Sequence, residues 1–297
     1  MKQIRLFATL LMVALMATSC ITWVEEDDIN NGNGNSNGNG NGSNNLKTGQ
    51  IEMKVYPDTN NRLSFSATTN KITIDWGDGY IDKLTPNGVS QTFSHIYANQ
   101  NLHTIYIESE KLVRFTTSVS ISFKELYFGE MKELIEINCG SSQLTILEIK
   151  KATALTSLNC RSHQLTSLDV RGCPALKELD CVNNQITSLN VSGLTALITL
   201  QCGGNQLTSL NVSGLTALTK LTCGGNQLTS LNVSGLTALT YLDCFRNQLT
   251  SNSLNSLFES LPNGLENDWN IIYINTNPGT NECNRAIAEN KGWKVNY

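Results

Sequence analysis

Six cysteines recur at a constant interval of 21 residues through the second half of this chain. Neither metal sites nor disulfide frameworks are spaced in this way. A fixed period of about 20–30 residues is the mark of a solenoid, in which each period forms one coil stacked on the next. The sequence therefore predicts a stack of 21-residue coils. The periodic cysteines are Cys139, Cys160, Cys181, Cys202, Cys223 and Cys244.

Further residue types follow the same period. The stretch 197–217 reads L-x-x-L-x-C-x-x-N-Q-L-T-S-L-x-V-x-G-L-x-A. Leucine and cysteine alternate with variable residues in L-x-C, so both should point inward from a short strand. Stacked coils then place the cysteines above one another in the core, where this small, apolar side chain is commonly buried.

This pattern resembles the leucine-rich repeat, and its cysteine column resembles the cysteine-ladder branch of bacterial repeats found in some internalin-type surface proteins. The resemblance implies an α/β-type leucine-rich-repeat solenoid with parallel strands on its concave face. We assign the repeats to residues 134–250. Residues 113–133 match the columns in degenerate form, so we expect an atypical first coil that caps the stack. Residues 251–297 lose the period and should cap the other end, with helices at 253–261 and 282–289 and strands at 271–274 and 293–295.

A column of asparagines accompanies the cysteines. An inward asparagine can satisfy the backbone groups freed where each strand turns, and each such group would otherwise cost about 1–3 kcal/mol. His163 occupies this column in an earlier coil, which favours a structural role for it over a functional one. The predicted structural asparagines are Asn184, Asn205, Asn226 and Asn247.

We predict that the six ladder cysteines are free, buried thiols. Neighbouring strands lie about 4.8 Å apart, and parallel side chains keep their Cβ atoms about that far apart. A disulfide needs Cβ atoms about 3.5–4.5 Å apart, so the ladder geometry disfavours one. The ladder has no C-x-x-C pairing for a metal ion, and all six thiols would face a dry core. The sequence therefore predicts no metal site and no cofactor.

The first 20 residues look like a sorting signal. Lys2 and Arg5 precede an apolar run at 6–16, which is too short to span a bilayer. Small residues before Cys20 resemble a bacterial lipobox, which implies a lipid on Cys20; a plain secretory cleavage nearby is the alternative. An acidic cluster at 25–28 resembles the surface-export signal of Bacteroidetes lipoproteins. We therefore expect a protein held on the outer membrane only through Cys20 and exposed at the cell surface.

Residues 21–46 should form a flexible tether between this anchor and the fold. The stretch 30–45 is almost entirely Asn, Gly and Ser, and it has no apolar side chain whose burial could offset its ordering entropy. Such a chain reaches roughly 20–25 Å, which lifts a domain off a membrane.

Alternating apolar residues predict a β domain at 47–112. The stretches I-T-I-D-W-G-D-G at 72–79 and F-S-H-I-Y at 93–97 resemble the PKD family, which implies a small all-β, immunoglobulin-like sandwich used as a spacer or adhesion module. Asp75 and Asp78 are too few for a calcium site. A turn with Gly77 and Gly79 explains these residues better.

Outward positions of the predicted sheet differ from coil to coil. Tyr241, Phe245 and Arg246 should cluster at one end of this face, and such residue types dominate binding hot spots. The alternative is that Phe245 packs under the C-terminal cap. Paired glycines at 203–204 and 224–225 make the middle flat, which either admits a close-lying ligand or reflects recent duplication. The further candidate binding residues are Asp243, Lys220, Glu178, Asp180 and Arg161.

Charge and motifs narrow the function classes. The formal net charge is −4 and no basic stripe is present, so we expect no nucleic-acid partner. The sequence has no nucleophile elbow, H-E-x-x-H motif or P-loop, so we expect no enzyme. Repeat solenoids present extended surfaces that suit protein ligands. We therefore expect binding of a protein on the concave face; surface glycan binding for nutrient capture is the second hypothesis, and a ligand-free envelope spacer is the third.

Overall fold

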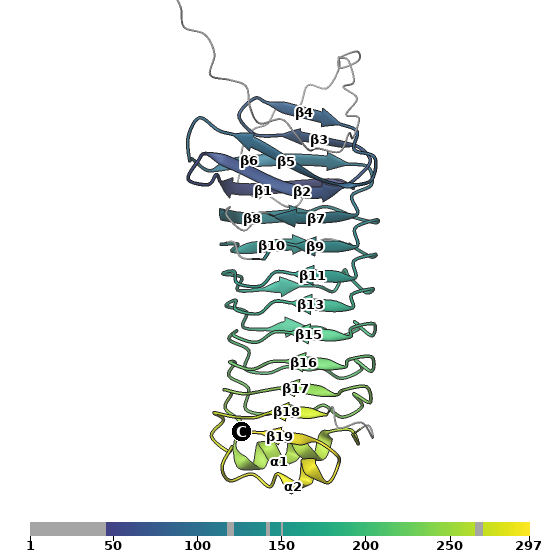
Figure 1. Cartoon of the computed structure of the whole chain (residues 1–297), viewed down its shortest axis with the longest axis vertical. Coiled ribbons are helices and arrows are strands. Elements are labelled where there is room, and N and C mark those ends of the chain that lie inside the picture. The colour runs from purple at the N-terminus through teal and green to yellow at the C-terminus, as the bar shows by residue number, and fades with distance from the viewer. Residues whose placement is uncertain (1–45, 118–121, 141–142, 150, 265–269) are drawn as a thin grey trace, which may run out of the picture.

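The computed structural model describes residues 46–117, 122–140, 143–149, 151–264 and 270–297. These residues form a long stack of coils with a β domain at one end and two short helices at the other (Figure 1). No helix among them has the length and apolar character that a membrane span requires. The predicted sorting signal, Cys20 and nearly all of the predicted tether lie outside the described part of the chain.

Each coil contributes one short strand to a parallel ladder, as the L-x-C period predicts. Strand β9 (Glu136–Asn138) pairs with β11 (Ser157–Asn159), so that Leu158 lies beside Ile137 one period away. The same register joins the following strands, and the middle residue of each is buried in the core. These strands are β13 (Glu178–Asp180), β15 (Thr199–Gln201), β16 (Lys220–Thr222) and β17 (Tyr241–Asp243).

The opposite side of the stack is built from turns and short strands rather than helices. Strands β12 (Leu168–Asp169) and β14 (Leu189–Asn190) form a two-stranded sheet there, and a side-chain cap follows in these coils and in the later ones. For example, Asn211 Oδ1 accepts a hydrogen bond from the backbone N–H of Ser213 at 3.0 Å. We expected an α/β-type solenoid, but the described coils contain no helix. A 21-residue coil that already holds a strand and two tight turns leaves too few residues for a stable helix.

The ladder cysteines act as core side chains. All six are fully buried thiols, and burial raises the pKa of each, to about 12 for Cys139. Cys173 stands in the column that leucines occupy in later coils; it is also fully buried, and burial raises its pKa to about 11. The solenoid therefore contains the cysteine ladder that the period predicts.

Asn205 shows how the asparagine column joins neighbouring coils. Its Nδ2 donates to the carbonyl oxygens of Cys181 and Cys202 at 3.0 and 3.1 Å. Its Oδ1 accepts from the backbone N–H of Ile186 at 3.0 Å. One side chain thus satisfies three buried backbone groups in two coils. The same bonds recur at Asn184, Asn226 and Asn247.

Two antiparallel sheets face each other in the β domain. Aromatic residues fill the space between them: the Phe65 ring lies 6.0 Å from Trp76 and 5.4 Å from Phe93, measured between centroids. The first sheet contains β1 (Gln50–Tyr56), β6 (His103–Ser109), β3 (Ile72–Asp75) and β4 (Ile81–Leu84), and the second contains β2 (Arg62–Thr68) and β5 (Ser90–Ile96).

The W-G-D-G motif forms the predicted turn. Asp75 Oδ1 accepts from the N–H of Gly77 at 2.9 Å, and Asp78 Oδ1 accepts from the N–H of Tyr80 at 3.2 Å. The backbone of Gly77 has φ +77°, which favours glycine there. Asp78 also pairs with His95 Nε2 at 2.7 Å. These carboxylates therefore order the turn.

The β domain and the solenoid share both of their sheets. Strand β8 (Ser122–Phe128) pairs antiparallel with β1 and parallel with β10 (Ile146–Ile149). Strand β7 (Arg114–Thr117) pairs antiparallel with β2 and parallel with β9. We expected residues 113–133 to close the stack themselves. The strands of that segment are instead covered by β1 and β2, so the β domain closes this end.

Irregular structure closes the other end of the stack. Helix α1 (Ser251–Ser260) buries Leu257 and Phe258, and Thr250 Oγ1 caps its N-terminus by accepting from the N–H of Ser253. Trp293 is buried, and its Nε1 donates to the carbonyl of Pro262 at 2.9 Å. The ladder continues through β18 (Ile271–Tyr273) and β19 (Lys294–Asn296), with the short helix α2 (Ala286–Glu289) between them in the sequence.

Candidate binding groove on the strand face

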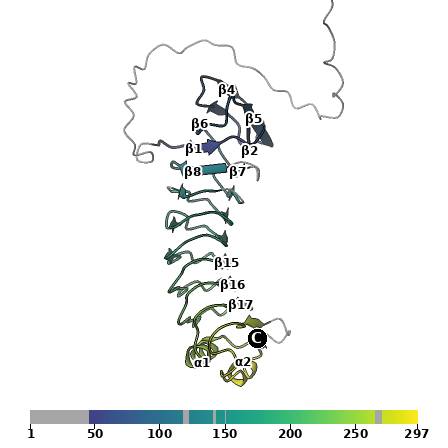
Figure 2. The same ribbon diagram turned by 90° about the vertical axis from the view of Figure 1, so that its left-hand side faces the viewer.

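The outward side chains of the parallel ladder from β9 to β17 form one surface, which we call the strand face. Side chains alternate along a strand, so the two residues that flank each buried leucine or isoleucine point outward. The strands β15, β16 and β17 lie on the same side of the stack (Figure 2). Two hollows lie on this face, and Gln201 lines both of them.

The first hollow, which we call the strand hollow, runs across the middle of the strands and is polar. Its volume is about 370 Å³. Hydrogen bonds link its side chains along the stack, as where Asn159 Nδ2 donates to Asn138 Oδ1 at 3.2 Å. Three of the predicted binding residues line this hollow: Glu178, Asp180 and Lys220.

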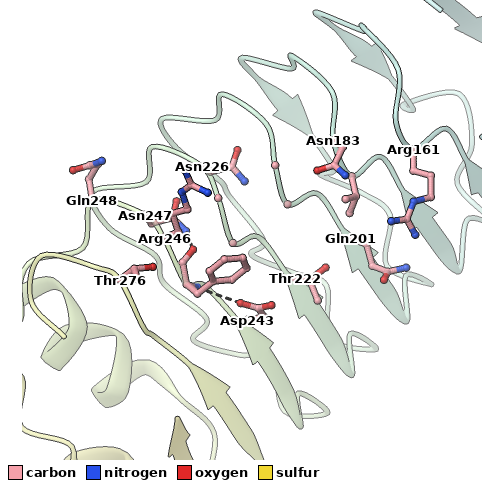
Figure 3. Close-up of a pocket in the computed structure, with 16 residues that line it drawn as sticks. Arg161, Asn183, Gln201, Thr222, Asn226, Asp243, Arg246, Asn247, Gln248 and Thr276 are labelled. Atoms are coloured by element: carbon pink, nitrogen blue, oxygen red, sulfur yellow. Dashed lines mark hydrogen bonds between the residues drawn. The ribbon is translucent and has the colours of Figure 1, made fainter. Parts of the chain in front are cut away.

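The second hollow, which we call the glycine groove, follows the ends of the strands and has a volume of about 650 Å³. Arg161 lies toward one end and Arg246 toward the other, with Gln201 and Thr222 between them (Figure 3). No histidine or cysteine is among its described lining residues, so the groove can bind through charge, hydrogen bonds and apolar contact. Four predicted residues line it: Arg161, Asp243, Phe245 and Arg246.

Phe245 belongs to this groove rather than to the C-terminal cap. Its side chain is 36% exposed. A Cβ atom at Gly224 would collide with the Phe245 ring, so the ring lies directly over this glycine in the preceding coil. The alternative that Phe245 packs under the cap is therefore wrong, and the glycine at 224 is required for the position of the ring.

Tyr241 does not join Phe245 and Arg246, although we expected the three to cluster. Tyr241 and Phe245 lie four residues apart along an extended segment, so they face different parts of the strand face. The Tyr241 ring lies 5.7 Å from the ring of Tyr273, and Lys220 Nζ lies 5.1 Å from its centroid. Tyr241 is absent from the residues that line the glycine groove.

Arg246 adopts a backbone conformation that disfavours its residue type. Its φ angle is +49°, in the left-handed region. The same column has left-handed φ in the preceding coils, where the last two occupants are Gly204 and Gly225. An arginine at such a position carries strain that a glycine would avoid.

The charges around the groove are unevenly balanced. Asp243 is partly buried, which raises the pKa of its carboxyl group, and its Oδ1 accepts from the N–H of Phe245 at 3.2 Å. Arg161 Nη1 lies 3.6 Å from Asp180 Oδ2. Arg246 is exposed and has no ion pair with any residue in the described part of the chain.

Several groove residues were not among the sequence candidates. The paired glycines predicted the flat middle of this face. The 21-residue repeat pattern, however, does not distinguish Val182 from the other outward residues. Thr276 comes from the loop after β18, and it reaches the groove only because the cap folds back beside the last coil.

Comparison with known proteins identifies part of the solenoid. Residues 174–217 match the family described as "Leucine Rich repeats (2 copies)", so the chain contains leucine-rich repeats. No curated protein matches the chain. A solved structure described as the functional domain of InlJ from Listeria monocytogenes, which includes a cysteine ladder, is 26% identical with a TM-score of 0.40. That match covers 62% of this chain and 49% of the other, so the chain spans about half its length.

Proposed function

We propose that this protein is a non-enzymatic binding protein that holds a protein partner on its strand face. One observation carries the proposal: the parallel ladder displays one continuous outward surface with two adjoining hollows of about 370 and 650 Å³. Both hollows are shallow and lie side by side along the stack, which suits an extended macromolecular ligand. A small substrate is more often enclosed in a single apolar pocket.

The chemistry of the strand face supports binding over catalysis. Among the described residues, no group of three or more His, Cys, Asp or Glu side chains is placed to hold a metal ion. His95 belongs to the turn of the β domain and His163 is buried in the asparagine column. The ladder thiols are buried, and their raised pKa values keep them protonated. These groups serve the fold in our proposal.

The cellular location is the second half of the proposal. The lipobox-like segment before Cys20 and the acidic cluster at 25–28 support an outer-membrane protein anchored by lipid and exposed on the cell surface. The anchor is tested by incorporation of labelled palmitate into the wild-type chain and the Cys20→Ser variant, and surface display by protease treatment of intact cells. Equal labelling of the two chains would remove the anchor from the proposal.

The binding proposal is tested with parallel panels of extracellular proteins and glycans. Thr199→Arg places a long charged side chain in the strand hollow, at the centre of the face. Its matched control is Ser213→Arg on the opposite side, in the column where Arg171 already stands. We expect a protein ligand that binds the wild type and the control but binds Thr199→Arg at least about tenfold more weakly, as expected for a blocked interface centre.

Other outcomes would contradict the proposal in different ways. A protein ligand that binds Thr199→Arg as well as the wild type would move the site away from the strand face. Binding to glycans alone would favour a glycan-binding lipoprotein. The absence of any ligand in both panels would favour a ligand-free spacer.

A further inference from the structure

The backbone amide that follows each ladder cysteine points toward the strand face. In three coils it is capped by the side chain two residues earlier, the first being that of Arg161, whose N–H donates to Asn159 Oδ1 at 3.2 Å. The N–H of Val182 donates to Asp180 Oδ1 at 3.1 Å, and the N–H of Phe245 donates to Asp243 Oδ1 at 3.2 Å. The acceptors are outward side chains of the ladder. The amide hydrogen at this position is therefore directed outward.

The same amide lacks a partner in the coil that contains Gly203. The backbone follows the same path, since the next residue is again left-handed, with φ +65° at Gly204. The residue two positions earlier is Gln201, whose side chain does not cap this amide. No residue in the described ranges accepts a hydrogen bond from the N–H of Gly203. The N–H of Gly203 is thus left for a ligand, and the N–H of Gly224 in the next coil likewise has no acceptor in the described ranges.

Gly203 brings no side chain of its own to the glycine groove that it lines. The three atoms nearest to a Cβ atom built at Gly203 are backbone atoms of Gly224, and the carbonyl oxygen at 2.9 Å is too close, so this position favours glycine. The outward neighbours along the stack are Val182 on one side and the Phe245 ring, which lies over Gly224, on the other. Gly203 is largely buried, but it lines the glycine groove between two apolar neighbours.

Positive charge adjoins this unpaired donor. Arg246 lines the same groove and has no ion pair within the described ranges. Two coils separate its backbone from Gly203, a distance of about 10 Å at about 4.8 Å per coil, which a long arginine side chain and a ligand can span together. A guanidinium and a backbone N–H are both donors that favour a carboxylate.

Taken with the proposed protein ligand, on which this inference rests, we propose that the glycine groove is a carboxylate-binding subsite for an extended, acidic segment of that partner. The carboxylate accepts a hydrogen bond from the N–H of Gly203 and pairs with the Arg246 guanidinium. An apolar side chain beside it in the partner packs against the Phe245 ring.

The unfavourable backbone of Arg246 supports a functional reason for the residue. Both preceding coils have Gly-Gly where this coil has Phe245-Arg246, although glycine suits the left-handed position better. Ser162 and Asn183 hold the same left-handed position in earlier coils, so Arg246 restores a non-glycine residue after two glycine coils. Strain of this kind is typical of binding sites. Phe245 is also the groove's one aromatic lining residue among the described ones, which offers a peptide side chain a contact but gives a long glycan few stacking platforms.

The direct test observes the amide of Gly203 by NMR during titration with two probes. The first probe is the N-acetylated, C-terminally amidated dipeptide Asp-Phe, and the second is the same dipeptide with Asn in place of Asp. We expect the acidic probe, at millimolar concentrations, to shift the Gly203 amide resonance and to bind at least about tenfold more tightly than the neutral one. Glucuronate and inorganic phosphate serve as further probes.

A matched pair of variants makes the assignment specific. Arg246→Gly restores the residue of the two preceding coils, and Arg171→Ser likewise restores the residue of later coils on the opposite side. We expect Arg246→Gly to lose the response to the acidic probe and Arg171→Ser to keep it. Since both changes follow the repeat pattern, both variants should fold, which the dispersion of their amide spectra verifies.

Three results would overturn the inference. They are an unmoved Gly203 amide, equal shifts with the acidic and the neutral dipeptide, or an undiminished response in Arg246→Gly. A larger response to glucuronate or phosphate than to the dipeptide would replace the acidic peptide with a glycan or a free anion. Failure here together with a protein ligand that Thr199→Arg blocks would leave the proposed function standing and remove only this subsite.

Discussion

At the scale of the residue, one asparagine per coil holds adjacent coils together. Asn205→Ala would leave the N–H of Ile186 without a partner in the core. It would also remove one of the two asparagine hydrogen bonds to each of the carbonyls of Cys181 and Cys202, which keep those from Asn184 and Asn226. We expect the free energy of unfolding to fall by about 1–3 kcal/mol, the cost of one unsatisfied buried group. Urea denaturation followed by circular dichroism measures the change.

A second asparagine of the same coil supplies the control for this prediction. Asn211 lies on the exposed opposite side, where it caps only the N–H of Ser213. Asn211→Ala should cost less than about 1 kcal/mol, because water can replace the lost bond. Equal losses in the two variants would show that the buried column does not stabilise the stack in the way described.

We expect Arg246 to make the fold no more stable, or slightly less stable, than a glycine would at this position. Arg246→Gly removes left-handed backbone strain of about 1–2 kcal/mol from the folded state. Part of this stabilisation is offset because glycine also has more conformational freedom in the unfolded chain. We therefore expect a free energy of unfolding that is unchanged or raised by up to about 1 kcal/mol. A loss of more than about 1 kcal/mol in urea denaturation would mean that the arginine side chain stabilises the fold.

At the scale of the element, the cysteine ladder is a column of protonated thiols. We expect the ladder thiols of the folded protein to resist a thiol reagent at pH 8, because only the thiolate reacts and burial both raises their pKa values and blocks access. Cys283, which is only partly buried, should react first among the described cysteines. Rapid labelling of several thiols before unfolding, detected by mass spectrometry, would contradict a closed core.

The same ladder should make the fold sensitive to alkali. Its thiols have pKa values above the usual value of about 9 when folded, reaching about 12 at Cys139. The unfolded chain therefore loses these protons first as the pH rises. Their contribution to stability is complete below about pH 9 and is lost as the pH rises toward the folded pKa values. The midpoint temperature of thermal unfolding should fall between pH 8 and pH 11. The fall should be smaller in a variant in which Cys202 and Cys223 are replaced by Ala.

The elements of the coils could be predicted from the sequence because each follows from a local period. Alternation in L-x-C places Leu200 and Cys202 inward, and their repetition at one-period intervals sets the register of the whole ladder. We expected Tyr241 to lie with Phe245 and Arg246, but it lies outside the glycine groove. Spacing along the chain does not show where a hollow lies. The unpaired amide of Gly203 has no sequence signal except by comparison with the coils in which Asp180 or Asp243 provides a cap.

At the scale of the whole molecule, the β domain and the solenoid form one structure. A separable module would be joined to its neighbour by a linker. Here β1 pairs with β8 and β2 pairs with β7, so both sheets cross the predicted boundary at residue 112. The sequence did not show this, because the two parts have different periods and their pairing is set by distant strands. A stiff junction of this kind would hold the strand face in a fixed direction relative to the β domain (Figure 2).

Aromatic side chains pack across this junction. The fully buried ring of Phe65 in β2 lies 5.5 Å from Phe115 in β7, as well as against Phe93 within the β domain. Phe65→Ala should cost about 3–5 kcal/mol. Amide hydrogen exchange should speed up both in the β domain and at Ile137 in β9. Because stability in a stack is passed between neighbouring coils, the effect should fade before Leu242 in β17. Faster exchange confined to the β domain would instead show two modules that unfold independently. As a control, Ile81→Ala at an exposed position of β4 should leave hydrogen exchange in every coil unchanged.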